Sequence, residues 1–343
     1  MSVLDRYSRQ TLFEGIKKAG QEKLLNSHAV IIGCGALGTM QLEMLARAGV
    51  KRLRAIDRDF VEFSNLHRQI MFDEIAAKTH LPKAIAACER IAQINSDIEA
   101  ESIVADVNHT NIEKFIADAD IVLDGTDNFE TRFLINDACI KHNKPWIYGA
   151  AVSSYGLTMA VLPGQTPCLR CVFENAPPPG SSPTCDTAGV ILPIIAVIAA
   201  YQTTEALKIL TGNLENLHKG LIQIDLWQNT YSKINVQSLL ERADCRACQH
   251  KQFDFLVAEN RQLMTTLCGR NAVQIVPSQI TKLDLISIAE KLKSCGEVNV
   301  NKFLLRVKLE NYEMTVFSDA RSIIHGTKDE SIARGLYAKY IGV

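Results

Sequence analysis

The sequence lacks any apolar run long enough to cross a membrane. Its longest apolar stretch, residues 190–200, is interrupted by Pro193 and is well short of the roughly 20 residues that a spanning helix needs. The first residues also carry no apolar core of the kind found in secretory signal peptides. We therefore expect a cytoplasmic protein with no membrane partner, in which this stretch begins a buried helix.

A large excess of charge of one sign is also missing. Lys and Arg number 37 and Asp and Glu 38, for a formal net charge of −1. This balance argues against a broad basic surface for nucleic acid, although one local basic pocket is still compatible with it. Hydrophobic residues at 47% and charged residues at 22% are ordinary for a soluble α/β enzyme.

The hydrophobic pattern of the first 150 residues alternates between short strands and helices. Strands are expected at residues 28–32, 53–56, 121–123 and 146–148. Helices are expected at residues 37–48, 83–94 and 131–142. This alternation predicts an α/β fold with a doubly wound, Rossmann-like, mostly parallel sheet.

The composition changes at Pro163 and again near residue 251. A loop rich in Pro, Gly, Ser and Thr covers residues 163–188, and a helix near 190–211 and strands at 221–226 and 234–236 follow it. We expect one domain over residues 1–251 and a small α+β module over residues 252–343. The module's expected helices are 282–293 and 328–340, and its expected strands are 303–309, 314–317 and 322–325.

A glycine-rich turn follows the first expected strand and opens the first expected helix. Gly33, Gly35 and Gly38 allow a tight turn in which backbone amides approach a phosphate, and the helix N-terminus adds partial positive charge. Asp57 ends the next strand, 19 residues after Gly38, where it can accept hydrogen bonds from ribose hydroxyls. The pattern predicts a nucleotide site rather than only a tight turn, but does not separate ATP from NAD or FAD.

Polar and charged residues follow the ends of the other strands. Asn65 and Arg68 come after the second strand, Lys83 opens the next helix, and Asp127 follows the strand at 121–123. Taken singly, each charged residue is most often a solvated surface group. Several cations and an acid around phosphates suit nucleotidyl transfer better than hydride transfer, because charge develops on the bridging oxygens as pyrophosphate leaves.

Together these motifs resemble the ThiF/MoeB/HesA family of bacterial adenylyltransferases, which are similar to ubiquitin-activating E1 enzymes. The resemblance covers roughly residues 5–250. It depends on Arg6-Tyr7-Ser8-Arg9-Gln10, the glycine turn, Asp57-Arg58-Asp59, Ser64-Asn65-Leu66-His67-Arg68-Gln69, Pro82-Lys83, Asp124-Gly125-Thr126-Asp127-Asn128 and two CxxC pairs in that order.

The resemblance implies ATP-dependent adenylation of the C-terminal glycine carboxylate of a small β-grasp sulfur carrier, with release of pyrophosphate. It implies that Arg68 and Lys83 hold the triphosphate, Asn65 assists, and Asp127 holds Mg²⁺. It also implies a homodimer in which Arg9 reaches the partner's site.

Two carriers and two other function classes remain open at this point. A ThiS-like carrier, for thiamine thiazole synthesis, is preferred, and a MoaD-like carrier, for the molybdenum cofactor, is the alternative. An NAD-dependent oxidoreductase would have little use for Arg9, Lys83 or Asp127. A non-catalytic scaffold would not need this set of charged residues.

Four of the ten cysteines form two CxxC pairs, Cys168 with Cys171 and Cys245 with Cys248. Four thiolates complete a closed, structural Zn²⁺ site. With 73 residues between the pairs, such a site would join distant segments of the chain. Redox-active dithiols or unligated cysteines are the alternative.

Cys185 falls at the position of the family's loop cysteine. There it is either a nucleophile that forms a persulfide-linked or acyl-disulfide intermediate with the carrier, or a loop cysteine with no role in adenylation. A helix N-terminus beside it would lower its pKa and favour the thiolate.

Overall fold

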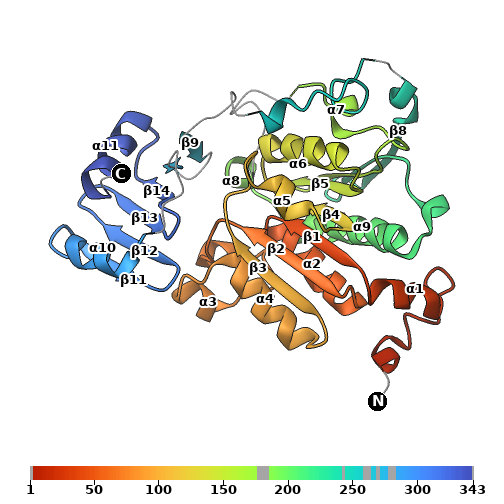
Figure 1. Cartoon of the computed structure of the whole chain (residues 1–343), viewed down its shortest axis with the longest axis horizontal. Coiled ribbons are helices and arrows are strands. Elements are labelled where there is room, and N and C mark those ends of the chain that lie inside the picture. The colour runs from red at the N-terminus through yellow and green to blue at the C-terminus, as the bar shows by residue number, and fades with distance from the viewer. Residues whose placement is uncertain are drawn as a thin grey trace. The chain divides into compact units, whose positions relative to one another are not determined.

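The computed structural model describes residues 3–175, 185–241, 244–257, 264–267, 271–276 and 283–341. The chain divides into two compact units, Met1–Ala258 and Glu259–Val343 (Figure 1). This division falls after the boundary at 251 expected from the sequence, because residues 252–257 pack on the larger unit. The backbone N–H of Phe255 donates to Oδ2 of Asp137 at 3.2 Å, and its ring centroid lies 5.0 Å from that of Phe133.

The larger unit is built on an eight-stranded sheet with the strand order β3-β2-β1-β4-β5-β6-β7-β8. The strands are β1 (His28–Ile32), β2 (Arg52–Asp57), β3 (Glu99–Val104), β4 (Ile121–Asp124), β5 (Trp146–Val152), β6 (Tyr155–Val161), β7 (Gly220–Asp225) and β8 (Thr230–Asn235). The strands from β3 to β5 in this order are parallel, and β6, β7 and β8 extend the sheet with antiparallel pairings. The expected doubly wound, mostly parallel sheet is confirmed.

Helices cover both faces of this sheet. The described α-helices of the larger unit are α1 (Lys17–Leu24), α2 (Ala36–Ala48), α3 (Glu74–Lys78), α4 (Lys83–Ile94), α5 (Ile112–Ile116), α6 (Phe129–Lys141), α7 (Leu169–Val172), α8 (Cys185–Ala188) and α9 (Leu192–Thr211). Side chains alternate between the faces of a strand, so Ala29 and Ile31 of β1 join the core with α2 and α4. Val30 and Ile32 join a separate core with α5 and α6 on the other face.

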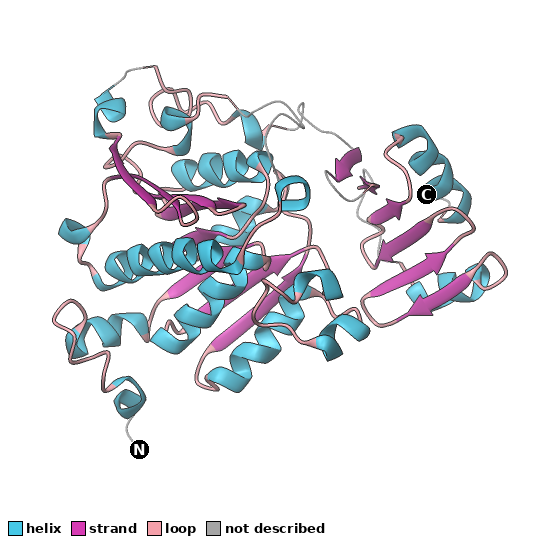
Figure 2. Cartoon of the chain, turned by 180° about the vertical axis from the view of Figure 1, so that it is seen from behind, coloured by secondary structure: helices cyan, strands magenta, loops and turns pink. Residues whose placement is uncertain are grey.

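Helix α9 continues the apolar stretch at residues 190–200 through Thr211. In the described part of the chain it is the one helix that is long and apolar enough to cross a membrane by length and composition, and 50% of its apolar window is buried inside the protein. It packs against β5, β6 and α2 (Figure 2) and buries the polar side chains of Gln202 and Glu205. These contacts are those of a core helix.

The smaller unit contains a six-stranded antiparallel sheet with the order β11-β12-β13-β14-β10-β9. Its elements are β9 (Met264–Leu267), β10 (Ala272–Ile275), α10 (Leu285–Leu292), β11 (Glu297–Val300), β12 (Leu304–Lys308), β13 (Glu313–Phe317), β14 (Ser322–His325) and α11 (Glu330–Tyr340). Apolar side chains of the sheet and of both helices form one core. The strands β9, β10 and β11 were not expected from the sequence.

Candidate functional site

Three loops meet where the strand order of the large sheet reverses. The chain leaves β1 into α2 on one face and leaves the neighbouring β4 into α6 on the other, while β2 ends beside β1 at Asp57. In open α/β sheets the crevice at this carboxyl edge is where ligands bind. The loops after β1, β2 and β4 carry most of the site residues expected from the sequence.

The glycine turn packs directly on the loop after β4. Gly33 has a φ of +92°, and a Cβ on it would lie 2.6 Å from the carbonyl oxygen of Gly125. A Cβ on Gly38 would lie 1.8 Å from the carbonyl oxygen of Gly33, whereas one on Gly35 would meet no atom closer than 3.8 Å. Packing therefore requires glycine at positions 33 and 38. Gly35 is the N-cap of α2, so the first N–H groups of that helix lie at the edge of the turn.

Asp57 fastens the glycine turn to the end of β2. Its Oδ2 accepts a hydrogen bond from the backbone N–H of Cys34 at 2.6 Å, and its Oδ1 accepts one from the N–H of Asp59 at 2.7 Å. Each carboxylate oxygen has a second lone pair that can accept from a ribose hydroxyl. Burial raises the pKa of Asp57, and the charge of Lys83 opposes that shift. Burial also raises the pKa of the Cys34 thiol well above its ordinary value, which disfavours the thiolate form.

Lys83 is a buried cation at the start of α4, with only 4% of its surface exposed. Its backbone N–H donates to the carbonyl of Asp59 at 2.9 Å, and its Nζ lies 3.5 Å from Oδ2 of the same residue. An ammonium group has three donors, and Asp59 is its one side-chain partner among the described residues, so donors are left for the oxygens of a phosphate.

Asn65 and Arg68 lie on the segment between β2 and α3. Oδ1 of Asn65, a residue 2% exposed, accepts from the N–H of Glu62 at 2.9 Å, and within the described residues its Nδ2 makes no hydrogen bond. The Arg68 guanidinium donates to the carbonyl of Ser64 at 2.7 Å. The N–H of Val61 donates to the carbonyl of Leu81 at 2.9 Å, which joins this segment to the residues just before Lys83.

Asp127 lies two residues beyond Gly125, and its side chain is exposed. Its Oδ1 accepts from Nδ2 of Asn128 at 3.3 Å. Burial alone would lower the pKa of Arg58 and of Arg132. Nearby carboxylates, Asp127 among them, have the larger and opposite effect, so both pKa values are raised. Mg²⁺ binds proteins through one or two carboxylates together with nucleotide phosphates, and an exposed carboxylate beside a nucleotide turn fits that requirement.

A buried polar network around Asp124 was not recognised from the sequence. The Asp124 carboxylate is fully buried and accepts hydrogen bonds from the backbone N–H and hydroxyl of Thr126, from the N–H of Gly149 and from Arg132. Its carbonyl accepts from Nε2 of Gln41 at 2.8 Å and from Nε2 of Gln202 at 2.9 Å. The available signal was the polar residues Gln41 and Gln202 among the apolar residues of α2 and α9.

Arg9 is not brought to the site within one chain. It is exposed in a turn whose neighbours pack at the C-terminal end of α2, where Nε2 of Gln10 donates to the carbonyl of Ala48 at 2.8 Å. The glycine turn is at the opposite end of this helix of 13 residues, about 20 Å away.

Cys185 is the first residue of the short helix α8, and its side chain lies outside the described residues. The structure therefore leaves both alternatives for this cysteine as they stood from the sequence.

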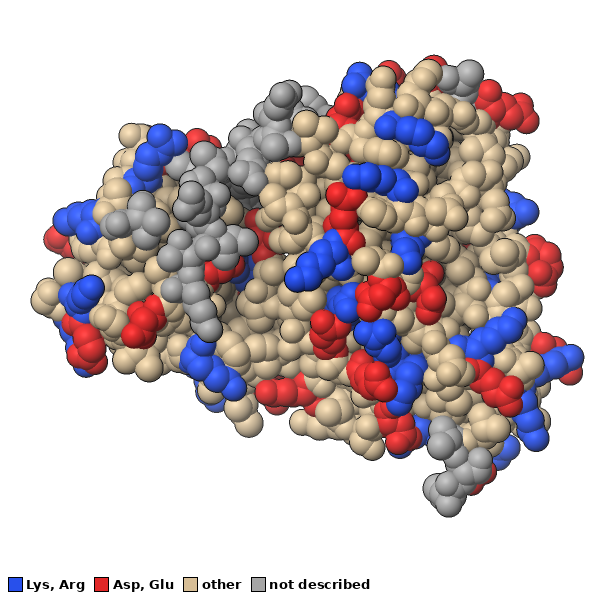
Figure 3. Space-filling view, viewed as in Figure 1, with Lys and Arg blue, Asp and Glu red and all other residues tan. Residues whose placement is uncertain are grey.

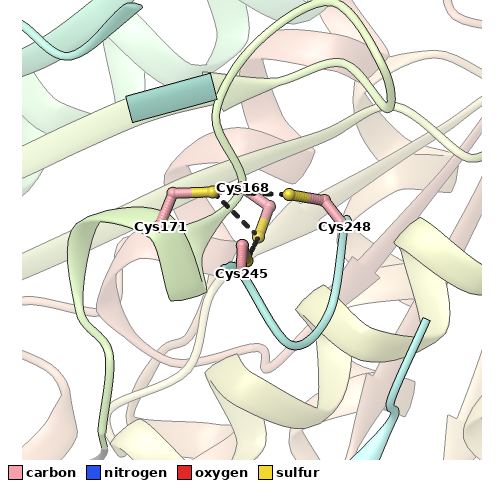
Figure 4. A group of neighbouring side chains, drawn as sticks. All are labelled: Cys168, Cys171, Cys245 and Cys248. Carbon is pink, nitrogen blue, oxygen red and sulfur yellow. Dashed lines mark hydrogen bonds between the residues drawn. The ribbon is translucent and has the colours of Figure 1, made fainter. Parts of the chain in front are cut away.

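The four cysteines of the CxxC pairs come together (Figure 4). Their Sγ atoms all lie within 4.8 Å of one another, with separations of 3.7 Å for Cys168–Cys171, 3.6 Å for Cys168–Cys245 and 3.4 Å for Cys171–Cys248. These distances are too long for disulfides, whose sulfur atoms lie about 2.05 Å apart. A tetrahedral metal with metal–sulfur bonds of about 2.3 Å places its sulfurs about 3.8 Å apart. The cluster fits a closed tetrathiolate metal site.

Charged residues brace this cluster from outside. Asp254 pairs with Arg170 of the first CxxC pair at 3.0 Å and with Arg246 of the second at 2.9 Å. The backbone N–H of Leu169 donates to Oδ1 of Asn136 at 2.9 Å, which fixes the first pair to α6. The same helix begins next to Asp127.

Charges of both signs are interspersed on the face of the larger unit shown in Figure 3. The balanced composition predicts this distribution, and no broad basic area is present on that face among the described residues.

Comparison with known proteins places the chain in a family. The ThiF family model matches residues 7–247. The chain is 47% identical over 338 residues to the sulfur carrier protein ThiS adenylyltransferase of Bacillus subtilis (strain 168), covering 98% of this chain and 99% of the relative. It is 36% identical to the SAMP-activating enzyme E1 of Haloferax volcanii over 71% of this chain and 88% of that enzyme.

A solved structure of MccB from E. coli has the same fold, with a TM-score of 0.62 at 24% identity over 73% of this chain and 75% of the MccB chain. The match to the first of these relatives covers 98% of this chain and therefore includes both units. This chain belongs to the ThiF family.

Proposed function

We propose that this protein uses ATP to adenylate the C-terminal carboxylate of a small sulfur-carrier protein. The observation that carries the proposal is the convergence of the glycine turn, Asp57, Lys83 and the loop of Asp127 at one edge of the sheet. The packing of Gly33 on Gly125 and the hydrogen bond from Cys34 to Asp57 hold these loops together. The similarity to a ThiS adenylyltransferase supports the same activity.

The chemistry requires charge compensation rather than a general base. A C-terminal carboxylate has a pKa of roughly 3.5, so it is ionised at neutral pH and can attack the α-phosphorus directly. The obstacle is the repulsion between this anion and the triphosphate. Lys83 and Arg68 would bind phosphate oxygens, and Nδ2 of Asn65 would donate to another. Asp127 would hold Mg²⁺, which neutralises further charge on the phosphates when bound.

The carrier is proposed to be ThiS-like, which places the reaction in thiamine thiazole synthesis. The test is exchange of radiolabelled pyrophosphate into ATP, with a ThiS-like carrier and a MoaD-like carrier offered separately. We expect exchange with the ThiS-like carrier and none when its last glycine is deleted. Exchange with only the MoaD-like carrier would reassign the pathway, and no exchange with either carrier would refute the function.

Arg9 is proposed to act in the site of a second copy of the chain, because its segment lies at the far end of α2 from its own site. Mixing an Arg9→Ala variant with a Lys83→Ala variant tests this arrangement. If Arg9 acts across the dimer, each mixed dimer regains one complete site and about a quarter of wild-type activity returns. If Arg9 acts within its own chain, mixing restores nothing.

We propose that the four cysteines hold one Zn²⁺ per chain as a structural ion. Four thiolates leave no open position for water or substrate, so the ion would take no part in catalysis. Bridging Cys168 and Cys171 to Cys245 and Cys248 would fix the long crossover between β6 and β7.

The role of Cys185 can be tested with the same exchange assay and with mass spectrometry. Adenylation needs no thiol, so Cys185→Ser should keep full pyrophosphate exchange under either alternative. Loss of a covalent adduct with the carrier, seen by mass spectrometry under non-reducing conditions, would identify Cys185 as the nucleophile. An adduct that persists in the variant would leave it a loop cysteine.

A further inference from the structure

The turn that carries Asp127 is held by one buried arginine. Arg132, in the first turns of α6, is 6% exposed. Its Nε donates to Oδ2 of Asp124 at 3.2 Å and its Nη2 donates to the carbonyl of Thr126 at 2.8 Å. The guanidinium carbon lies 5.5 Å from the ring centroid of Phe129 and 5.6 Å from that of Tyr148. The arginine thus joins the end of β4, the turn and the start of α6.

Every polar backbone group of Thr126 is fixed by this arrangement. Its N–H and its hydroxyl donate to Oδ1 of Asp124 at 2.9 Å and 2.6 Å, and its carbonyl accepts from Arg132. On the other side of Asp127, Oδ1 of Asn128 caps α6 by accepting from the N–H of Thr131 at 2.9 Å. The backbone of Asp127 is therefore held on both sides, while its carboxylate stays exposed for a ligand.

From this geometry we propose that Arg132 is a positioning residue that fixes the direction in which Asp127 presents its carboxylate to Mg²⁺. The proposal rests on the proposed function, because it takes Asp127 as the magnesium ligand. Arginine suits this position because its rigid, planar fork holds the carboxylate and the carbonyl through separate nitrogen atoms in a fixed relative direction, whereas a compact ammonium group imposes no such plane. Residues behind a metal ligand commonly change metal affinity or activity by about 10–100-fold.

The test compares Arg132→Lys with Arg54→Lys. Arg54 is a matched control: it is 8% exposed, pairs with Asp118 at 2.6 Å and Glu101 at 2.7 Å, and donates to the carbonyl of Phe115. Calorimetry gives the affinity for ATP with and without Mg²⁺, which needs no carrier protein. We expect Mg²⁺ to tighten ATP binding by the wild type, and this gain to fall about tenfold in Arg132→Lys and to be unchanged in Arg54→Lys.

Three results would overturn the proposal. Mg²⁺ could tighten ATP binding by Arg132→Lys as much as by the wild type, both variants could lose this tightening equally, or the wild type could show none. If Arg132→Lys does not fold, Thr126→Val replaces it, since it removes only the hydroxyl bond to Asp124 and should lower the gain in the same direction. An unchanged gain in that variant would also refute the role. Pyrophosphate exchange by the wild type is scored separately, so failure of the proposed function is distinguished from failure of the positioning role.

Discussion

Gly38 lies so close to Gly33 that a Cβ on Gly38 would be 1.8 Å from the carbonyl oxygen of Gly33. Gly38→Ala should therefore destabilise the protein by at least about 2 kcal/mol, because backbone rather than a flexible side chain must move. Gly35→Ala is the matched control, since its Cβ would meet only ordinary contact at 3.8 Å. Urea denaturation measures both, and equal stabilities would show that the turn relaxes at no cost.

Removing the carboxylate of Asp127 should separate binding from chemistry. We expect Asp127→Ala to keep the ATP binding measured without Mg²⁺, because the glycine turn, Asp57 and Lys83 are untouched, and to lose pyrophosphate exchange by about 100-fold. Glu130→Gln is the control, because Glu130 is an exposed acid in the first turn of α6. Near-normal exchange by Asp127→Ala would remove Asp127 from its proposed role.

Losing one thiolate should release the structural metal. Metal analysis of the wild type should give about one zinc per chain, and Cys168→Ser should give close to none because three thiolates hold Zn²⁺ far less tightly. Cys295→Ser, at an exposed cysteine of the smaller unit, should keep the metal. Undiminished zinc in Cys168→Ser would refute the tetrathiolate site.

His28 should make the protein more stable at pH 7 than at pH 5. Burial lowers the pKa of His28 below its ordinary 6.5, although the Asp118 carbonyl and charge partly oppose the shift. Between the lowered value and 6.5 the unfolded chain binds more protons than the folded one, so stability rises with pH through this window and is lost as pH falls. His28→Gln cannot titrate and should reduce the pH dependence seen in urea denaturation. An identical pH dependence in both proteins would contradict the assignment.

Local patterns were sufficient to predict four of the five parallel strands of the large sheet. The apolar strand at residues 28–32, the glycine turn and the helix after it follow from spacing alone, and the structure confirms these elements. Strand β3 (Glu99–Val104) was not predicted, because it is an edge strand with charged and exposed residues and lacks an apolar run. The strands β9 and β10 are short and lie between segments without a clear periodic pattern.

The support of the site could not be predicted in the same way. Gln41 and Gln202 both donate to the carbonyl of Asp124, yet they lie 83 and 78 residues from it in sequence. No local pattern links such positions, and only the packing of α2 against α9 brings them together. Local patterns could not predict the surroundings of Arg9 either, since its proposed partner residues would belong to another molecule.

The spacing of the cysteines has a consequence for biosynthesis. Cys168 and Cys171 emerge from the ribosome long before Cys245 and Cys248, with α9 and the hairpin of β7 and β8 made in between. A nascent chain can offer the ion only two ligands until this whole segment has been synthesised and folded onto the sheet. Capture of the proposed Zn²⁺ would thus be a late event, and polypeptides truncated before the second pair would be left without the cross-link.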